Sequence, residues 1–367
     1  MITFVTAALA VYTLRLVFFL FGQLRHSVAV FSKDSTPTVS VIVPARNEEH
    51  TIERCLRALL ASDYPADKLE IIVVNDRSTD GTEEVLNRLS ATDGRVRALH
   101  RRNTLDHPNL KGKPGALQHG IDVATGDVLL LTDADCSVDK QWVRTLAQRF
   151  DDEAVGMVCG FTVIRTETLF DAVQDVEWLY TQTMARAGIR NGIPLGCFGN
   201  NMALRRRAYE AVGGYSAIPF SITEDLAILQ VFTEAGWKVQ YICDPSAVVE
   251  TLPCDSLGEY LRQKHRWVRG GMALGSKAAV FVLTGAFYWV GICASILSGW
   301  WAVAALFLLL RILGDGLMIG TTIRRLGRWN RLAAVAPSIV LLLGLELLLP
   351  VMALRKTIVW KNQVFRQ

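Results

Sequence analysis

Two aspartates separated by one alanine, Asp133 and Asp135, are the residues of this sequence best suited to metal chemistry. They directly follow the apolar segment 127–131, which has the composition of a buried strand. Mg²⁺ and Mn²⁺ take oxygen ligands from one or two carboxylates and neutralise the charge of a diphosphate. Acidic residues also end strands simply because they are solvated there, so the pair gains its weight from its surroundings. The pattern predicts a metal site for a nucleotide diphosphate.

The elements around this pair predict an α/β fold. Strands are expected over 39–43, 70–74, 96–99 and 127–131, and helices over 49–61, 82–90 and 115–124. Strands that alternate with helices indicate a mostly parallel sheet with helices on both faces. Ligands bind such sheets at the carboxyl ends of the strands. Three strand ends carry polar residues: Arg46, Asn47 and Glu48 after the first strand, Asp76 after the second, and Asp133 and Asp135 after the fourth.

Other ways of binding nucleotides or metals are excluded by the sequence. No GxGxxG follows the first strand, and Gly270–Lys277 ends in Ser-Lys where a Walker A loop needs Lys-Ser or Lys-Thr. The net charge of +4 is too small for a nucleic-acid-binding protein. The seven cysteines include no CxxC pair, which argues against a zinc site or a disulfide framework and favours a reducing compartment.

Three apolar regions predict membrane segments in a chain that is 51% hydrophobic. Residues 1–21 are expected to form an uncleaved signal anchor. The uncharged run 278–310 is long enough for one tilted helix or, as we favour, for two helices joined near Ser298 and Gly299, the second of which continues to about Ile319. A third apolar region covers 332–354.

Basic residues beside these segments predict the orientation, because they prefer the cytoplasm. Arg25 and the loop from Arg324 to Arg331 place the middle of the chain in the cytosol, so we expect an integral protein of the inner or plasma membrane with a cytosolic catalytic domain. The basic tail conflicts with a single last crossing, unless Pro337 and Pro350 bend that segment into a re-entrant hairpin or 278–310 crosses only once. The expected domains are an anchor at 1–24, a catalytic domain at 38–254, an interfacial amphipathic helix at 255–277, transmembrane helices at 278–354 and a tail at 355–367.

Five motifs in series resemble those of family 2 glycosyltransferases. They are Val39-Ser-Val-Ile-Val-Pro-Ala-Arg-Asn-Glu48, Val73-Val-Asn-Asp-Arg-Ser-Thr-Asp-Gly-Thr82, Thr132-Asp-Ala-Asp135, Thr223-Glu-Asp225 and Gln263-Lys-His-Arg-Trp267. The last is similar to the QxxRW of the membrane-bound branch, which includes the glucosylceramide, hyaluronan and cellulose synthases. The resemblance covers roughly residues 38–270 and implies a GT-A fold, a divalent cation (Mg²⁺ or Mn²⁺) and inversion at the anomeric carbon.

The resemblance also implies roles for individual residues. Asp225 would be the general base, and Asp135 would ligate the metal with help from Asp133. The acceptor side would comprise Gly199, Asn200, Glu224 and Trp267. The nucleotide-sugar would be bound by Pro44, Arg46, Glu48, Asp76, Lys113, Asp133, Gln263, Arg266 and Trp267.

Structural interpretations stand beside these roles. Glu224 and Asp225 would also suit the acidic first turn of a helix. Gly199 and Asn200 would suit an ordinary turn. The basic residues around Gln263 would suit an amphipathic helix that faces anionic lipid.

The predicted activity is transfer of one sugar, by default from UDP-glucose or UDP-galactose, to a membrane lipid. Ceramide, diacylglycerol, a polyprenyl phosphate and a hydroxylated carotenoid are all candidate acceptors, because the motifs do not choose among them. A processive polysaccharide synthase needs a channel for its polymer, and three or four membrane crossings are few for such a channel. The synthase is therefore only the alternative to the lipid glycosyltransferase. A membrane scaffold that binds nucleotide-sugar without turnover is the second alternative, and Asp225 argues against it because such a scaffold needs no base.

Overall fold

The chain divides into two compact units, which are described separately. The computed structural model describes residues 1–25, 35–103, 107–360 and 363–366, so residues 361, 362 and 367 of the expected tail lie outside the described part. One unit, here called the sheet unit, comprises Ser27–Arg165 and Gly196–Leu252. The other, the helical unit, comprises Met1–His26, Thr166–Leu195 and Pro253–Gln367.

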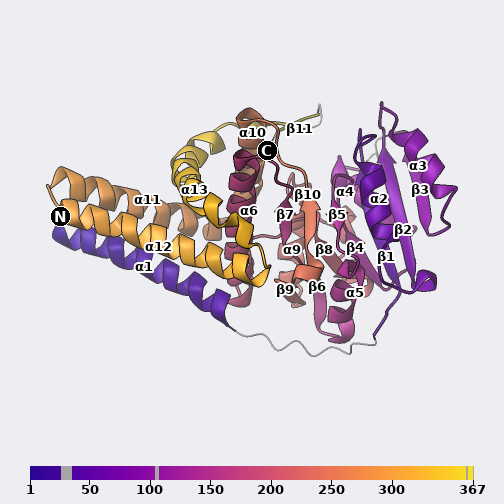
Figure 1. Ribbon diagram of the computed structural model, residues 1–367, viewed down its shortest axis with the longest axis horizontal. Coiled ribbons are helices and arrows are strands. Elements are labelled where there is room, and N and C mark those ends of the chain that lie inside the picture. Colours follow the sequence, from indigo (N-terminus) through magenta and orange to yellow (C-terminus); the bar gives the residue numbers. More distant parts are fainter. Residues whose placement is uncertain (26–34, 104–106, 361–362, 367) are drawn as a thin grey trace. The chain divides into compact units, whose positions relative to one another are not determined.

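The sheet unit is built on a seven-stranded sheet with the order β3-β2-β1-β4-β8-β6-β9 (Figure 1). Only β8 runs antiparallel to its neighbours in this sheet, which confirms the predicted α/β class with a mostly parallel sheet. The strands are β1 (Val39–Ala45), β2 (Leu69–Asp76), β3 (Val96–Arg101), β4 (Val128–Leu131), β6 (Val155–Cys159), β8 (Met202–Arg205) and β9 (Lys238–Tyr241).

Helices and a small sheet complete this unit. The three-stranded sheet pairs β5 (Ser137–Val138), β10 (Val249–Thr251) and β7 (Thr162–Ile164). The first predicted helix starts three residues later than expected, because the Glu48 and Glu49 amides donate to Thr82 and Asp80 instead of belonging to a helical turn. The helices are α2 (Ile52–Leu60), α3 (Thr82–Ser90), α4 (Lys113–Ile121), α5 (Trp142–Ala147), α7 (Arg206–Ala211), α8 (Gly214–Ala217) and α9 (Glu224–Glu234).

The register of the sheet brings four loops to one edge. Ala45 at the end of β1 pairs with Asn75 near the end of β2, and Ile42 pairs with Leu131 at the end of β4. Leu131 in turn pairs with Met202, the first residue of antiparallel β8. The loops after β1, β2 and β4 and the loop before β8 therefore share the carboxyl edge of the sheet, where ligands bind folds of this kind.

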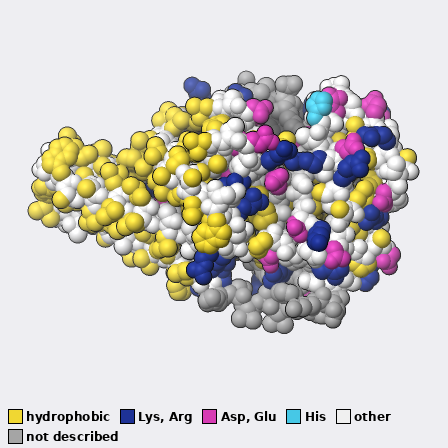
Figure 2. Space-filling view, viewed as in Figure 1, with side chains coloured by type: hydrophobic (Ala, Val, Ile, Leu, Met, Phe, Trp, Pro, Cys, Tyr) yellow, Lys and Arg dark blue, Asp and Glu magenta, His cyan; other side chains and the backbone are white. Residues whose placement is uncertain are grey.

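Within its described residues, the helical unit contains four helices that are long and apolar enough to cross a membrane. Their outward faces are rich in hydrophobic side chains, and such side chains gather over α1, α11 and α12 (Figure 2). The unit comprises α1 (Ile2–Leu24), α6 (Leu169–Arg190), α10 (Leu257–Gly271), α11 (Ser276–Leu297), α12 (Trp301–Arg325), α13 (Leu332–Ala353) and the hairpin of β11 (Thr357–Trp360) and β12 (Gln363–Arg366).

Two expectations about the apolar regions are decided by these helices. The 278–310 run belongs to two helices with a break at Ser298–Trp300, as favoured, although α12 continues to Arg325. The suggested hairpin at Pro337 and Pro350 is wrong, because both prolines lie inside the continuous helix α13. Neighbouring helices allow proline inside such a helix by supporting the backbone whose hydrogen bond is lost.

One helix of the expected catalytic domain, α6, packs with the apolar helices. The side chain of Asn191, which follows α6, donates to the Phe18 carbonyl of α1 at 2.7 Å. Thr183 shares a hydrogen bond of 2.6 Å with Thr322 of α12, and Asp175 pairs with Arg331 at 2.6 Å. The boundary at 38–254 stays a prediction, but 166–195 clearly contributes its packing to the helical unit.

Charged side chains form a connected network between the long helices. Arg311 of α12 pairs with Asp315 on the same helix and, at 2.7 Å, with Glu346 of α13. Arg15 of α1 lies 3.7 Å from Glu346, and the Tyr180 hydroxyl donates to Asp315 at 3.1 Å. Two positive and two negative groups thus neutralise each other among apolar helices. The network locks α1, α6, α12 and α13 together.

Replacing Arg311 by leucine is expected to destabilise the helical unit by about 3–5 kcal/mol, because it leaves the buried carboxylate of Asp315 without its cation. Thermal unfolding of the protein in detergent measures this loss. Arg324→Leu is the matched control, since Arg324 is an exposed arginine of the same helix. Equal unfolding temperatures for the two variants would contradict a stabilising role for the network.

Candidate active site

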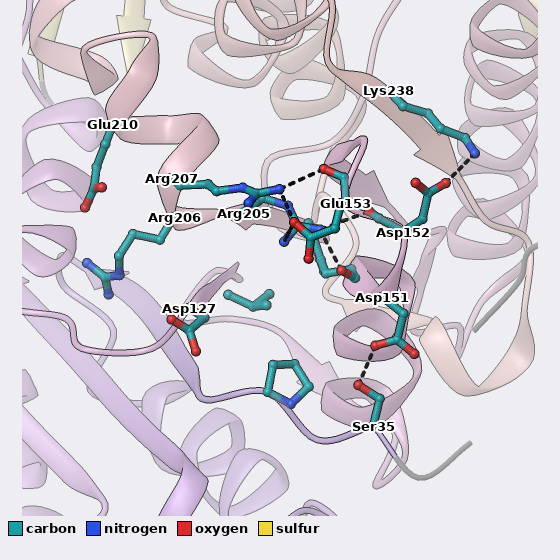
Figure 3. A pocket seen from close by; sticks show the side chains of 13 residues that line it. Ser35, Asp127, Asp151, Asp152, Glu153, Arg205, Arg206, Arg207, Glu210 and Lys238 are labelled. Carbon is teal, nitrogen blue, oxygen red and sulfur yellow. Dashed lines mark hydrogen bonds and ion pairs between the residues drawn. The ribbon is translucent and has the colours of Figure 1, made fainter. Parts of the chain in front are cut away.

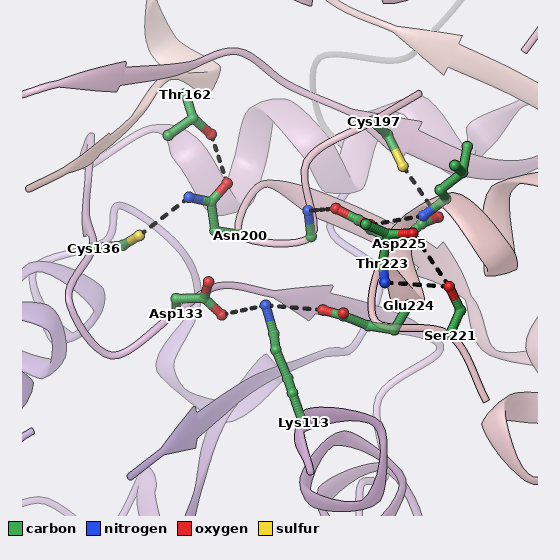
Figure 4. Close-up of polar contacts among 12 residues, drawn as sticks. Lys113, Asp133, Cys136, Thr162, Cys197, Asn200, Ser221, Thr223, Glu224 and Asp225 are labelled. Atoms are coloured by element: carbon green, nitrogen blue, oxygen red, sulfur yellow. Dashed lines mark hydrogen bonds and ion pairs between the residues drawn. The ribbon is translucent and has the colours of Figure 1, made fainter. Parts of the chain in front are cut away.

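Lys113 lies between two of the predicted site residues. Its ammonium group is 2.7 Å from the Asp133 carboxylate and 3.1 Å from Glu224 (Figure 4). Burial alone would lower the pKa of Lys113, but Asp133 and Glu224 raise it above its usual value. Lys113 begins α4, Asp133 follows β4 and Glu224 begins α9, so three separate elements meet at one ammonium group.

Asp225 lies beside this group in the first turn of α9. One carboxylate oxygen accepts from the Gly199 amide at 2.9 Å, and the other accepts from the Leu226 amide at 2.8 Å. Burial, and after it the charge of Glu224, raises the pKa of Asp225 to about 6, although Lys113 acts in the opposite direction. A carboxylate with a raised pKa near the operating pH has the property that a general base needs. The position of Asp225 in the acidic first turn of a helix is therefore compatible with a role as general base.

Asp133 and Asp135 fit a divalent cation. Both side chains are partly exposed, while Ala134 between them and Cys136 after them are buried, so the two carboxylates lie on the open side of the turn. No group of three or more His, Cys, Asp or Glu side chains suited to a metal occurs among the described residues. A cation that keeps water and phosphate oxygens as ligands needs only one or two carboxylates from the protein.

The loops after β1 and β2 are joined by hydrogen bonds. The backbone N–H of Asn47 donates to the Ser78 hydroxyl at 2.9 Å. The backbone N–H of Thr79 donates to the side-chain oxygen of Asn47 at 2.8 Å. Asn47 and Arg77 both adopt positive φ, 55° and 57°, which turns the chain sharply at these two strand ends. Pro44, Arg46 and Glu48 of the predicted nucleotide pocket lie in or directly after β1, beside these turns.

Asp76, one of the residues predicted to bind the nucleotide-sugar, is engaged within the protein. It is 4% exposed, forms two hydrogen bonds with Arg77 at 2.9 and 3.1 Å and lies 3.5 Å from Arg101. Contact with a bound nucleotide would require Arg77 to share or release this carboxylate. Sequence reasoning missed both arginines, although Arg101 ends β3 and could have been found by inspecting every strand end.

The two predicted acceptor-side residues of the loop before β8 differ in their surroundings. The backbone N–H of Gly199 donates to Asp225, and little room remains for a side chain, since a Cβ would lie 3.2 Å from atoms of Glu224 and Asp225. The Asn200 side chain accepts from Thr162 at 2.8 Å and donates to Cys136 at 3.7 Å (Figure 4). Asn200 therefore supports the loop, and its acceptor-side role stays a prediction.

Gln263, Arg266 and Trp267 belong to α10 in the helical unit. Gln263 and Arg266 are three residues apart and so lie on one flank of the helix. Trp267 packs against Trp178 of α6, with ring centroids 5.1 Å apart. The structure thus brings together Lys113, Asp133, Glu224, Asp225 and Gly199 in the sheet unit, while the last motif belongs to the other unit.

A cavity of about 950 Å³ lies at the opposite edge of the sheet (Figure 3). Its lining includes Val128, which begins β4, and Arg205, which ends antiparallel β8. Its charges are largely paired, since Lys238 lies 2.7 Å from Asp152 and Arg207 contacts Glu153. We do not assign the reaction to this cavity, because the carboxyl edge carries the carboxylates and the amide donors.

The chain resembles known glycosyltransferases in sequence. The model of glycosyl transferase family 2 matches residues 40–213, and that of glycosyl transferase family group 2 matches residues 128–349. An N-acetylglucosaminyltransferase of Rhizobium leguminosarum bv. viciae is 32% identical over 244 residues, which are 64% of this chain and 55% of that protein. A beta-monoglucosyldiacylglycerol synthase of Synechocystis sp. is 28% identical over 237 residues, 64% of this chain and 48% of that protein. The chain thus spans about half the length of the curated relatives it matches.

A solved structure has a similar fold. It is the mannosyltransferase PcManGT from Pyrobaculum calidifontis in complex with GDP-Man and Mn²⁺, with a TM-score of 0.62 and 19% identity. The match covers 92% of this chain and 98% of that one. The family models, the motif order and the GT-A-like sheet together show that this chain belongs to the family 2 glycosyltransferases.

Proposed function

We propose that this protein is a metal-dependent, inverting glycosyltransferase that transfers one sugar from a UDP-sugar to a membrane lipid. The observation that carries the proposal is the cluster around Lys113. There, a half-buried ammonium group contacts Asp133 and Glu224, and Asp225 lies beside it with a raised pKa. Such a cluster offers a carboxylate to the divalent cation of a diphosphate-sugar and a base to the acceptor.

The reaction would be a single displacement. Asp225 would take the proton of the acceptor hydroxyl as its oxygen bonds to the anomeric carbon, and the bond from that carbon to the diphosphate would break on the opposite face. A general base of this kind contributes about 10²–10⁴-fold to the rate. Mg²⁺ or Mn²⁺ held by Asp135 and Asp133 would neutralise charge on the departing diphosphate. The structural neighbour solved with GDP-Man and Mn²⁺ supports this use of the fold.

The remaining predicted residues have complementary roles in this proposal. Pro44, Arg46, Glu48 and Asp76 would line the nucleotide pocket, and Gln263 with Arg266 would hold the diphosphate. An arginine suits that task, because its planar group donates two parallel hydrogen bonds to phosphate. Gly199, Asn200, Glu224 and Trp267 would border the acceptor.

A lipid acceptor is supported by two independent features. Four helices are long and apolar enough for a membrane, so the acceptor can be presented from the bilayer. A relative of 28% identity is a beta-monoglucosyldiacylglycerol synthase, which makes diacylglycerol the first acceptor to test. UDP-glucose and UDP-galactose are the proposed donors, and UDP-N-acetylglucosamine is a useful competitor because another relative is an N-acetylglucosaminyltransferase.

The sheet unit is proposed to face the cytosol. Arg25 directly after α1 and Arg324 and Arg325 in the last turn of α12 supply basic residues at helix ends, as cytoplasmic segments do. Both ends of α13 contact cytosol-proximal helices in this arrangement: Arg331 pairs with Asp175 of α6, and Arg269 of α10 donates to the Ala353 carbonyl at 2.8 Å. The basic tail then need not lie on the far side of the membrane.

Purified protein in vesicles that contain diacylglycerol is expected to convert radiolabelled UDP-glucose or UDP-galactose, with Mn²⁺ or Mg²⁺, into an organic-soluble product. Thin-layer chromatography with UDP-N-acetylglucosamine and ceramide in parallel reactions identifies donor and acceptor. A water-soluble product of high mass would instead indicate a polysaccharide synthase. Binding of the UDP-sugar without transfer would indicate a scaffold.

The pH profile is expected to depend on Asp225. Only its ionised form acts as a base, and its pKa is about 6, so kcat/KM should fall as the pH drops through that value. Glu224→Gln should move this fall to lower pH, because the charge of Glu224 raises the pKa of Asp225. Asp225→Asn should keep UDP binding while transfer drops by about 10²–10⁴-fold. Full activity of Asp225→Asn would remove this residue from the mechanism.

Asp135→Ala is expected to abolish the part of UDP binding that depends on metal. Even partners outside the first coordination shell change metal affinity by about 10–100-fold, so the loss of a direct ligand should cost at least as much. Calorimetric titration of UDP with Mn²⁺ and with a chelator measures the difference. Asp139→Ala, an exposed aspartate just beyond the same turn, is the control. Unchanged metal dependence in Asp135→Ala would contradict the metal assignment.

A further inference from the structure

A lysine occupies the buried stripe of α10, inside the last predicted motif. Tyr260, Lys264 and Gly270 are the buried residues of this helix, and Lys264 is only 3% exposed. Residues four apart lie on one face, so Tyr260 and Lys264 together form the face that α10 turns toward α6. Apolar side chains are usual at such positions, which makes a cation there unexpected.

The partner of this lysine is Glu177 of α6, which is itself 3% exposed. One oxygen of Glu177 contacts the Lys264 ammonium group and accepts from the Tyr260 hydroxyl at 3.0 Å. The other oxygen accepts from Thr181 at 3.0 Å. Three donors from two helices thus surround one carboxylate, and the directions of these hydrogen bonds define how α10 is rotated against α6.

The same lysine also contacts the tryptophan of the motif. The Lys264 nitrogen lies 4.0 Å from the centroid of the Trp267 ring, close enough for a cation–π interaction. The Trp267 ring packs on Trp178, which follows Glu177 directly in the chain. Trp267 thereby contacts both the ammonium group and a second indole, and the Lys264 nitrogen also lies 5.9 Å from the centroid of the Trp178 ring.

Stability alone does not explain this arrangement. A buried ion pair costs desolvation energy that its attraction only partly returns, and apolar residues of similar size often stabilise a protein as well or better. Burial indeed lowers the pKa of Lys264 despite the charge of Glu177. The pair instead fixes how α10 is rotated against α6. In a helix with 3.6 residues per turn, Gln263, Arg266 and Trp267 share a face next to the one that carries Lys264, so the rotation of α10 sets the direction of all three.

We propose that Glu177 and Lys264 are positioning residues for the reaction, which orient Trp267 toward the acceptor and Gln263 and Arg266 toward the diphosphate. This inference rests on the proposed function, because it assigns those three residues to the substrates. Neither Glu177 nor Lys264 touches a substrate in this account. Their effect passes through the indole of Trp267 and through the orientation of the helix.

The test compares Lys264→Met with Lys264→Arg. Methionine keeps the length of the side chain but loses the charge, whereas arginine keeps both the ion pair and the cation–π contact. Lys264→Met should raise the acceptor KM and lower kcat, with up to about 10²-fold loss of kcat/KM from misplacement, and Lys264→Arg should restore most of it. Arg262→Met, which removes an exposed cation of the same helix, is the control.

A purely structural role would give a different result. Loss of folded enzyme lowers kcat but leaves both KM values unchanged, so an unchanged acceptor KM in Lys264→Met would overturn the proposal. Glu177→Gln/Lys264→Met, which removes both charges, checks this further, because it leaves no unpaired buried charge but should keep the raised acceptor KM. Recovery of the wild-type KM in this double variant would also overturn the proposal.

A measurement without turnover separates this inference from the proposed function. Two indoles 5.1 Å apart with planes at 57° should give an exciton couplet in circular dichroism, which Trp267→Phe identifies by difference. Lys264→Met should weaken the couplet, and Lys264→Arg and Arg262→Met should retain it. A couplet unaffected by Lys264→Met would sink the positioning role even if the wild-type enzyme proved active. An inactive wild type with the predicted spectra would sink the proposed function alone.

Discussion

The candidate site depends on charge compensation by one lysine. Asp133 comes from the loop after β4, and Glu224 and Asp225 come from the first turn of α9. Three carboxylates in a partly buried space would repel one another. Lys113 contacts two of them and favours the charged form of the third. The cation lets the carboxylates approach, while burial and, after it, the charge of Glu224 still raise the pKa of Asp225. A binding site for a cation and a base can therefore coexist within one cluster.

The sheet supplies the geometry for this compensation. Parallel β1 and β4 end at the same edge, and antiparallel β8 begins there, so Asp133 and Gly199 are brought close although they are far apart in sequence. The Gly199 amide then orients Asp225 through a hydrogen bond that a backbone donor makes rigid. The packing of the strands is thus the reason that Asp133, Asp225 and the loop of Gly199 lie together.

The helical unit also compensates buried charges by pairing them. Its apolar helices contain charged residues, and these are paired with one another instead of facing lipid, as in the network of Arg311, Asp315 and Glu346. Glu177 and Lys264 repeat the principle between α6 and α10. Buried pairs contribute little net stability but impose direction, so they specify which faces of the helices meet. The two units therefore use paired charges for orientation as well as for chemistry.

The sequence by itself determined the fold class, the strand ends and the main chemical candidates, because hydrophobic periodicity and turn residues are local properties. It placed Asp133, Asp135 and Asp225 near the ends of elements, and it predicted the break between α11 and α12. Only the tertiary structure decided which charged side chains form ion pairs: Arg77 and Arg101 with Asp76, Lys113 with Glu224, and Glu177 with Lys264. It also decided that α6 packs with the apolar helices. These pairings join residues distant in the chain, and no local pattern records the register and rotation that bring them together.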